Sequence, residues 1–135
     1  MTQPQAVPTP LAPISWGELL DKISILEIKA ARITASAALA NVRGELSQLN
    51  AVAADVLAAR ADVAVVKAEL RRVNEALWDI EDRIRERERA GDFGPVFIEL
   101  ARAVYRTNDE RGALKRRINT LLGSALVEEK HYSSY

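Results

Sequence analysis

Seven apolar residues between positions 63 and 84 recur at alternating intervals of three and four. They are Val63, Val66, Leu70, Val73, Leu77, Ile80 and Ile84. Such a heptad seam is typical of a helix that packs lengthwise against another helix. No stretch of useful length alternates apolar and polar residues with period two, so there is no strand signal. We therefore predict an all-α fold, an antiparallel helical bundle of three to four long helices with coiled-coil-like packing at a shallow angle.

Capping signals place the first helix at about residues 15 to 35, where Ser15 and Glu18 form an S-x-x-E capping box. A second helix is expected from about 37 to the mid-50s. The apolar register then changes between Asn50 and Asp62, although no glycine or proline marks the position. We favour a turn there, and one long helix with a stutter is the alternative.

The third helix is expected to end near residue 90, with Gly91 as its C-cap. Pro95 suits the first position of a fourth helix, which should run to about residue 122 before Gly123 stops it. "EEKHY" at 128–132 is expected to be a solvated tail, or alternatively a lid that folds back over polar residues.

The predicted first helix is apolar on two sides. One face carries Trp16, Leu19, Leu20, Ile23, Leu26 and Ala30, and the opposite face carries Ile25 and Ile28. A helix of this kind is buried on both sides. We expect it to lie either centrally in the domain or at an oligomer interface.

The sequence divides into two parts. Residues 1–14 contain four prolines, at positions 4, 8, 10 and 13, which forbid a helix and predict a flexible, disordered Pro-rich arm. A ligand for a proline-reading domain is the functional alternative for this arm. Residues 15–135 are expected to form a single helical domain, because a chain of 135 residues suits one core.

Composition excludes several kinds of site. The chain has 19 basic and 19 acidic residues, and this zero net charge argues against nucleic-acid binding. There is no cysteine and one histidine, so we expect no disulfide, thiol nucleophile, metal site or cofactor. The N-terminal residues lack a signal-peptide pattern, and no apolar run of about 20 residues could span a membrane. We therefore expect a cytoplasmic protein.

The fourth helix carries polar residues on its core face. At about 100° per residue, its apolar residues Phe97, Leu100, Val104 and Ile118 share one sector with Asn108, Arg111, Lys115 and Asn119. Glu27 falls on an apolar face of the first helix, and Asn74 and Glu81 lie beside the seam of the third. We therefore expect Arg111 and Lys115 to be buried and to contact at least one of these three residues, because an unpaired buried charge is costly.

Two interpretations of this polar face stay open. In the structural one, Glu27, Asn74 and Glu81 neutralise Arg111 and Lys115 in an interhelical network. In the functional one, the cations and amides line a pocket for an anionic ligand, since arginine donates two parallel hydrogen bonds to a carboxylate or phosphate. Trp16 and Trp78 are interpreted as packing residues, with ligand stacking as the alternative.

Four segments of the chain stand out together: "GELLDKISILEIK" (17–29), "VNEALWDIEDRIR" (73–85), "FIELARAVYRTNDERGALKRRIN" (97–119) and "GSALVEEKHY" (123–132). In this order they resemble an uncharacterised bacterial family of small all-helical domains of unknown function. Similar segments also occur in longer proteins linked to surface-polysaccharide glycosyltransfer. The resemblance implies a small helical bacterial protein and no established activity. It emphasises Asp21, Lys22, Glu27, Lys29, Asn108, Arg111, Lys115, Asn119, Glu128, Glu129 and Lys130.

With this resemblance, the candidate anion site comprises Arg111, Lys115, Asn108, Asn119, Glu27 and Lys22. The favoured function is a non-enzymatic helical interaction or adaptor module that self-associates or binds a protein partner. The resemblance would place it in bacterial surface-polysaccharide assembly. The alternative is a protein that binds a small anion, phosphate or carboxylate, or a small helical enzyme that uses the Arg111 and Lys115 cluster. No residue is assigned a catalytic role.

Overall fold

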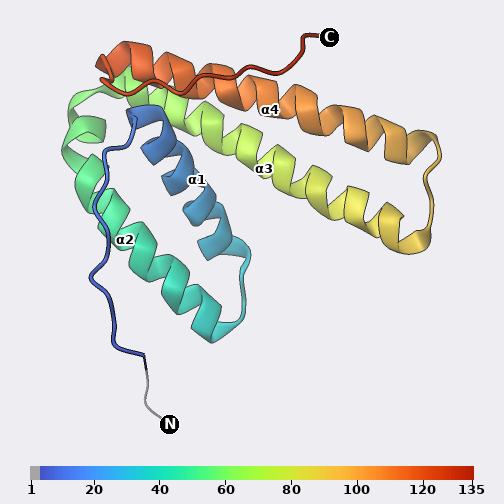
Figure 1. The fold of residues 1–135 in the computed structure, drawn as a ribbon, viewed down its shortest axis with the longest axis horizontal. Coiled ribbons are helices and arrows are strands. Elements are labelled where there is room, and N and C mark those ends of the chain that lie inside the picture. The colour runs from blue at the N-terminus through green and yellow to red at the C-terminus, as the bar shows by residue number, and fades with distance from the viewer. Residues whose placement is uncertain (1–3) are drawn as a thin grey trace.

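The computed structural model describes residues 4–135, and these form four α-helices and no strand (Figure 1). The helices are α1 (Trp16–Arg32), α2 (Ser36–Ala59), α3 (Ala61–Ala90) and α4 (Pro95–Leu122). The all-α prediction is confirmed. The change of register between residues 50 and 62 is a break at Arg60, so the expected turn is correct and the continuous helix is wrong.

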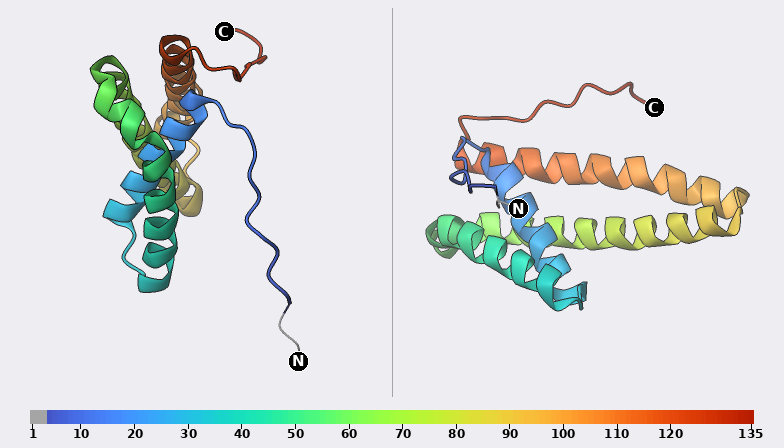
Figure 2. Two further views of the ribbon diagram at one scale, coloured as in Figure 1. Left: turned by 90° about the vertical axis from the view of Figure 1, so that its left-hand side faces the viewer. Right: turned by 60° about the horizontal axis from the view of Figure 1, so that its bottom comes forward.

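The helices form two hairpins of unequal length. The α3–α4 hairpin is long and antiparallel, and the α1–α2 hairpin crosses it obliquely near one end (Figures 1 and 2). The antiparallel packing at a shallow angle expected for the whole chain therefore does not describe the crossing of the two hairpins, although each hairpin is antiparallel (Figures 1 and 2). The outer part of the long hairpin, from Ile80 to Ala103, projects beyond α1 and α2 and is called the hairpin arm.

Helix α1 packs against each of the other three helices, and so does α3, although α3 touches α2 only slightly. Its two apolar faces are both used inside the chain: Ile23 and Leu20 lie in the core, and Ile28 on the opposite face is also fully buried. Ile25 is partly buried. The two-sided burial predicted for this helix is thus explained by its central position, without an oligomer interface.

The core lies where the four helices meet. Its buried cluster comprises Leu19, Leu20, Ile23, Ala53, Val63, Val66, Leu70 and Ile118. The heptad seam of α3 is fully buried at Val63, Val66 and Leu70, but its later residues, Leu77 to Ile84, are only partly buried. The difference arises because the hairpin arm has a single neighbouring helix.

The helix ends follow the capping signals. Gly91 and Gly123 adopt the left-handed conformation, with φ of 66° and 58°, and Pro95 occupies the start of α4. Ser15 Oγ accepts a hydrogen bond from Glu18 N at 3.2 Å. The Glu18 carboxylate does not return the bond within residues 4–135. It binds Lys115 Nζ instead, so only half of the predicted capping box forms.

The two chain ends differ in their contacts. Residues 4–14 contain no helix or strand and are exposed, as predicted for the Pro-rich arm, whereas residues 1–3 lie outside the described residues. The flexibility of the arm stays a prediction. Residues 124–135 return along α4 (Figures 1 and 2) and contact it through side chains, while residues 128–132 stay exposed, so the solvated tail and the fold-back are each borne out in part. None of the helices within residues 4–135 is long and apolar enough to cross a membrane.

The start of α1 lies directly against α4. Gly17 N donates to Asn119 Oδ1 at 2.7 Å, and Trp16 N donates to Ser124 Oγ at 3.4 Å. A Cβ atom added at Gly17 would collide with the backbone carbonyl oxygen of Lys115. The first N–H groups of α1, which have no partner within the helix, are thus bound by Asn119 in the last turn of α4 and by Ser124 just after that helix.

We expect Gly17→Ala to lower the free energy of unfolding by about 1–3 kcal/mol, because backbone atoms cannot move aside cheaply for the new methyl group. Gly44→Ala is the matched control. Gly44 lies inside α2 with open space around its Cα, so alanine there should raise the free energy of unfolding by about 0.5–1 kcal/mol. Urea denaturation midpoints measure both. Equal midpoints for Gly17→Ala and the parent would contradict the close approach of α1 and α4.

Candidate functional site

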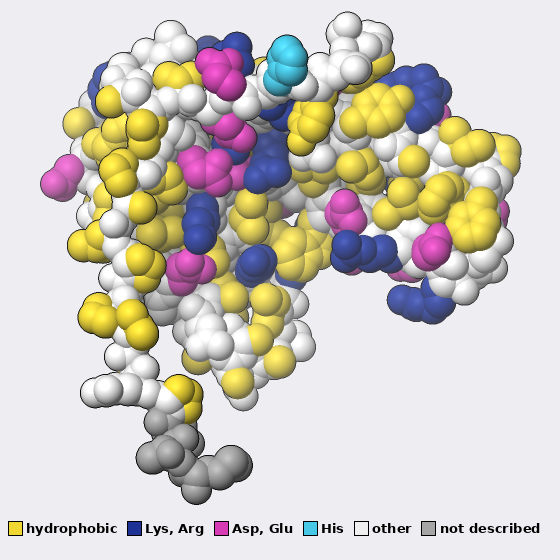
Figure 3. Space-filling view, viewed as in Figure 1, with side chains coloured by type: hydrophobic (Ala, Val, Ile, Leu, Met, Phe, Trp, Pro, Cys, Tyr) yellow, Lys and Arg dark blue, Asp and Glu magenta, His cyan; other side chains and the backbone are white. Residues whose placement is uncertain are grey.

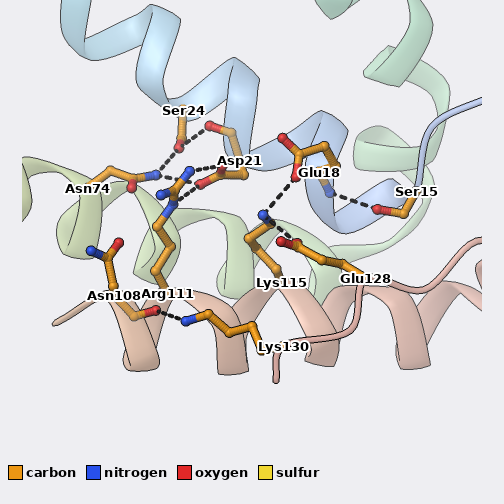
Figure 4. Close-up of polar contacts among 10 residues, drawn as sticks. All are labelled: Ser15, Glu18, Asp21, Ser24, Asn74, Asn108, Arg111, Lys115, Glu128 and Lys130. Carbon is orange, nitrogen blue, oxygen red and sulfur yellow. Dashed lines mark hydrogen bonds and ion pairs between the residues drawn. The ribbon is translucent and has the colours of Figure 1, made fainter. Parts of the chain in front are cut away.

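A buried polar cluster lies where α1 crosses α3 and α4 (Figure 4). Its centre is the Asp21 carboxylate, whose side chain is 1% exposed. Arg111 Nε donates to Asp21 Oδ1 at 2.9 Å and Arg111 Nη2 donates to Oδ2 at 2.5 Å. Asn74 Nδ2 donates to Asp21 Oδ1 at 2.9 Å. The carboxylate of α1 is therefore held by a two-pronged arginine from α4 and an amide from α3.

Ser24 completes this part of the cluster. Asn74 Nδ2 also donates to Ser24 Oγ at 2.8 Å, and Ser24 Oγ donates to the Asp21 carbonyl oxygen at 2.8 Å. The hydrogen bond to Asp21 raises the pKa of Arg111 above its ordinary value, although burial works in the other direction. Among residues 4–135, no buried side-chain nitrogen or oxygen lacks a hydrogen-bond partner.

Lys115 forms the second part of the cluster, one turn further along α4. Its side chain is 8% exposed, and Nζ lies 2.7 Å from Glu18 Oε2 and 2.6 Å from Glu128 Oε2. Burial lowers the pKa of Lys115, but the hydrogen bonds to Glu128 and Glu18 outweigh it and the net shift is upward. The ammonium group is therefore charged at neutral pH, with one carboxylate from α1 and one from the C-terminal tail.

The cluster contains three carboxylates, on Glu18, Asp21 and Glu128, and two cations, on Arg111 and Lys115. It therefore has no surplus of positive charge for an external anion. This balance favours the structural interpretation of the polar face of α4. The cluster ties three helices and the tail together at the point where they cross.

The predicted burial is confirmed for Lys115 and is partial for Arg111. Of the three predicted partners, Asn74 joins the cluster through the Asp21 oxygen that Arg111 also binds, whereas Glu27 and Glu81 do not. Glu27 binds Lys67 at 2.8 Å, and Glu81 binds Arg85 at 3.3 Å. The physical reason is the oblique crossing. Only the first turns of α1 lie against α4, so Asp21 and Glu18 reach its cations, whereas Glu27 lies further along and faces α3.

Of the remaining candidates, Asn108 lies beside the two cations and lines the same grooves, whereas Lys22 lies apart from them. Lys22 is exposed and binds Glu45 at 3.2 Å, so it does not join the cluster. Asn119 is buried, and its amide oxygen accepts from Gly17 N at the start of α1. Asn108 is partly buried, and its side-chain amide has no hydrogen bond within residues 4–135.

Periodicity contained a signal for Asp21 that our sequence argument did not use. Ile25 and Ile28 lie four and seven residues after Asp21, so all three share the second buried face of α1. A carboxylate on a buried face requires a partner. The resemblance to known segments, and not the periodicity, pointed to Asp21 and Glu128.

The C-terminal tail is tied to α4 by several contacts besides that of Glu128 with the buried lysine. Lys130 Nζ donates to the Asn108 carbonyl oxygen at 3.2 Å, and Tyr135 Oη donates to Asp109 Oδ2 at 2.6 Å. The rings of Tyr135 and Tyr105 meet edge to face, with centroids 5.0 Å apart. The alternative that this segment folds back over the polar residues is therefore supported.

Several grooves flank this architecture. One of about 400 Å³ lies between α4 and the tail, and Asn108, Arg111, Lys115, Glu128 and Lys130 are among its lining residues. Two others lie away from the tail. The crossing groove, of about 450 Å³, lies between α1 and the α3–α4 hairpin. Its lining residues are Ile25, Ile28, Lys29, Asn74, Leu77, Trp78, Glu81, Asp82, Arg85, Asn108 and Arg111. The arm groove, of about 410 Å³, lies on the hairpin arm between α3 and α4. Its lining residues are Ile80, Arg83, Pro95, Val96, Glu99, Leu100 and Ala103. In residues 4–135, no group of three or more acidic, histidine or cysteine side chains is placed to hold a metal ion.

Comparison with known families adds a classification. A model of DUF6165, a family of unknown function, matches residues 11–135. The chain belongs to the DUF6165 family. No curated protein and no solved structure matches it. The DUF6165 match includes all four helices and the C-terminal tail, so the polar cluster and these grooves lie inside the region that the family shares.

We expect Arg111→Met to lower the free energy of unfolding by about 3–5 kcal/mol, because it leaves the buried Asp21 carboxylate without its charge partner. Adding Asp21→Asn should recover part of this loss, since a neutral amide costs less to bury. Arg85→Met is the control, because Arg85 is largely exposed and its pair with Glu81 should contribute about 0.5 kcal/mol or less. Thermal or urea unfolding measures all four proteins. Equal losses for Arg111→Met and Arg85→Met would contradict the structural interpretation.

We expect Glu128→Gln to loosen the tail, because it replaces the carboxylate that lies 2.6 Å from Lys115 Nζ with a weaker, neutral acceptor. The backbone of residues 128–135 should become more mobile, which lowers its heteronuclear ¹⁵N nuclear Overhauser effect. Glu129→Gln is the matched control, since Glu129 is mostly exposed and lies 3.6 Å from Arg116. A more mobile tail in both variants, or in neither, would show that the contact with Lys115 does not hold the tail.

Proposed function

We propose that this DUF6165 domain is a non-enzymatic helical interaction module that self-associates through its hairpin arm. The observation that carries the proposal is the arm groove, an apolar strip between α3 and α4 that no other element within residues 4–135 covers. Leu100 lies buried in this groove, Ile80 and Ala103 are partly buried, and Val96 is 43% exposed. Figure 3 shows hydrophobic side chains spread over the projecting arm on the face in view.

A two-helix arm buries its apolar residues incompletely. In α3, the heptad seam is fully buried at Val63, Val66 and Leu70, where α1 and α2 add further layers, and is partly buried from Val73 onward, including the arm. A second hairpin laid against the arm would convert two layers of helix into a four-helix packing and remove this apolar surface from water. A pair of helices is therefore the partner that would complete the packing of the arm.

A second copy of the chain fits the charges at the rim of the groove. Arg83 lies on α3 and Glu99 on α4, on the two helices that form the groove. A two-fold axis that runs along the groove would lay α3 of one copy against α4 of the other. Arg83 of each copy would then face Glu99 of the second copy. The present partners of Glu99 are Arg102 and Arg106, both at 3.4 Å on the exposed surface of α4, and such pairs are weak.

The polar cluster supports the non-enzymatic part of the proposal. Its cations are paired with internal carboxylates, so it offers no unpaired charged group for chemistry. The zero net charge of the chain also limits electrostatic repulsion between copies. A cytoplasmic location and a place in surface-polysaccharide assembly stay predictions from the sequence.

The test is the mass of the protein in solution. We expect light scattering to give a dimer for the parent chain and a monomer for Val96→Glu, because the new carboxylate would be buried in the apolar groove. Val52→Glu is the matched control, since Val52 is an exposed valine on α2, outside the groove, and this variant should remain dimeric. Circular dichroism should give the same helix content for all three proteins. A parent chain that is monomeric at every concentration would contradict the proposal.

Charge reversal tests the two-fold arrangement itself. Arg83→Glu alone and Glu99→Arg alone should each weaken the dimer, because each places like charges opposite one another. The double variant should restore it, since the exchanged pair is again complementary. If the charge variants stay dimeric while Val96→Glu is monomeric, the apolar contact is supported and the proposed two-fold pairing of Arg83 with Glu99 is overturned.

A further inference from the structure

The crossing groove combines an apolar part with a polar end. Its volume of about 450 Å³ lies within the range of sites for small molecules. Ile25 and Ile28 of α1 and Leu77 and Trp78 of α3 supply apolar surface. The Trp78 ring is held in place by the guanidinium group of Arg32, 5.6 Å from its centroid. This part of the groove suits the apolar body of a ligand.

The polar end holds hydrogen-bonding groups that the fold does not use. Arg111 engages Asp21 through Nε and Nη2, which leaves Nη1 without a hydrogen bond in residues 4–135. Asn74 uses only Nδ2, so its Oδ1 is free of any bond to the described part of the chain. The Asn108 side-chain amide is unbonded there too, and Figure 4 shows it facing Asn74 with no contact between them. The side chains of Arg111, Asn74 and Asn108 therefore each keep hydrogen-bonding atoms that no described residue uses, at the polar end of the crossing groove.

Charge is divided across the groove. Lys29 on α1 has no ion pair within residues 4–135 and supplies the unbalanced positive charge of that side, where Arg111 on α4 adds a hydrogen-bond donor whose charge is balanced by Asp21. The α3 side carries Glu81 and Asp82, with Arg85 already bound to Glu81 at 3.3 Å. An anionic head is therefore attracted to the side formed by α1 and α4 and repelled from α3. A singly charged head fits this arrangement better than a phosphate dianion, because the charge of Arg111 is already balanced by Asp21.

We propose that the crossing groove binds a small carboxylic acid with an apolar body. The carboxylate receives hydrogen bonds from Lys29 Nζ, Arg111 Nη1 and the Asn108 amide, and the body lies against Ile28, Leu77 and Trp78. Planar donors suit a planar carboxylate. This site shares no residue with the arm groove, so it goes beyond the proposed self-association and does not depend on it.

Nuclear magnetic resonance of the full chain tests the proposal with three matched probes. Phenylacetate has both the charged head and the apolar body, phenylacetamide has the body with a neutral head, and acetate has the head alone. We expect phenylacetate to shift the Trp78 indole and Asn108 side-chain amide signals saturably. Phenylacetamide and acetate should bind at least about tenfold more weakly, since each lacks one of the two groups that the groove recognises. Inorganic phosphate should cause no saturable shift of these signals.

Two lysines of α1 provide matched variants. Lys29→Gln should weaken phenylacetate binding about tenfold, the loss of one charge-assisted hydrogen bond. Lys22→Gln removes an equal charge from the same helix at a residue that binds Glu45 outside the groove, and should leave the affinity unchanged. No saturable shift with phenylacetate, equal binding of acetate or phosphate, or equal effects of the two lysine variants would each overturn the proposal. Well-dispersed spectra of both variants confirm that the fold is retained.

Discussion

The two hydrogen bonds between Arg111 and Asp21 hold α1 across the long α3–α4 hairpin. Asp21 is fully buried, and a carboxylate in that position is tolerated only when a cation and further donors surround it. Arg111 approaches from α4 and Asn74 from α3, so one carboxylate specifies the positions of both helices relative to α1. Apolar packing alone would allow α1 to slide or rotate by a turn, whereas this network permits one register.

The same network determines what is left for function. Lys115 is shared between α1 and the tail, and Asn119 binds the start of α1, so two of the predicted ligand residues serve the architecture. Arg111 and Asn74 are only partly used, because each has more hydrogen-bonding positions than Asp21 and Ser24 can occupy. The unused positions face the crossing groove. A site beside a structural cluster gains rigid side chains, which is an advantage for recognition.

The hairpin arm has a different physical character. It continues the heptad seam of α3 beyond the layer supplied by α1 and α2, and so it leaves apolar surface between two helices with opposite charges on the rim. The DUF6165 match spans this arm together with the crossing region. The proposed self-association uses the arm and the proposed ligand uses the crossing groove, which divides the domain into two surfaces with separate chemistry.

Local sequence determined the elements of this protein. The seam from Val63 to Ile84 specified a helix, and Gly91 and Gly123 specified two helix ends, because periodicity and capping depend on neighbours within a few residues. The polar residues on the core face of α4 likewise showed that Arg111 and Lys115 needed partners inside the protein. Which carboxylates met them was decided by tertiary structure. Periodicity shows in which direction a side chain points from its own helix axis, but not the angle or the height at which two helices cross. The oblique crossing of α1 brought Asp21, and not Glu27, to Arg111. The tail likewise depended on a surface that exists only once α4 is packed, so its sequence of mixed charges could not distinguish a solvated end from a bound one.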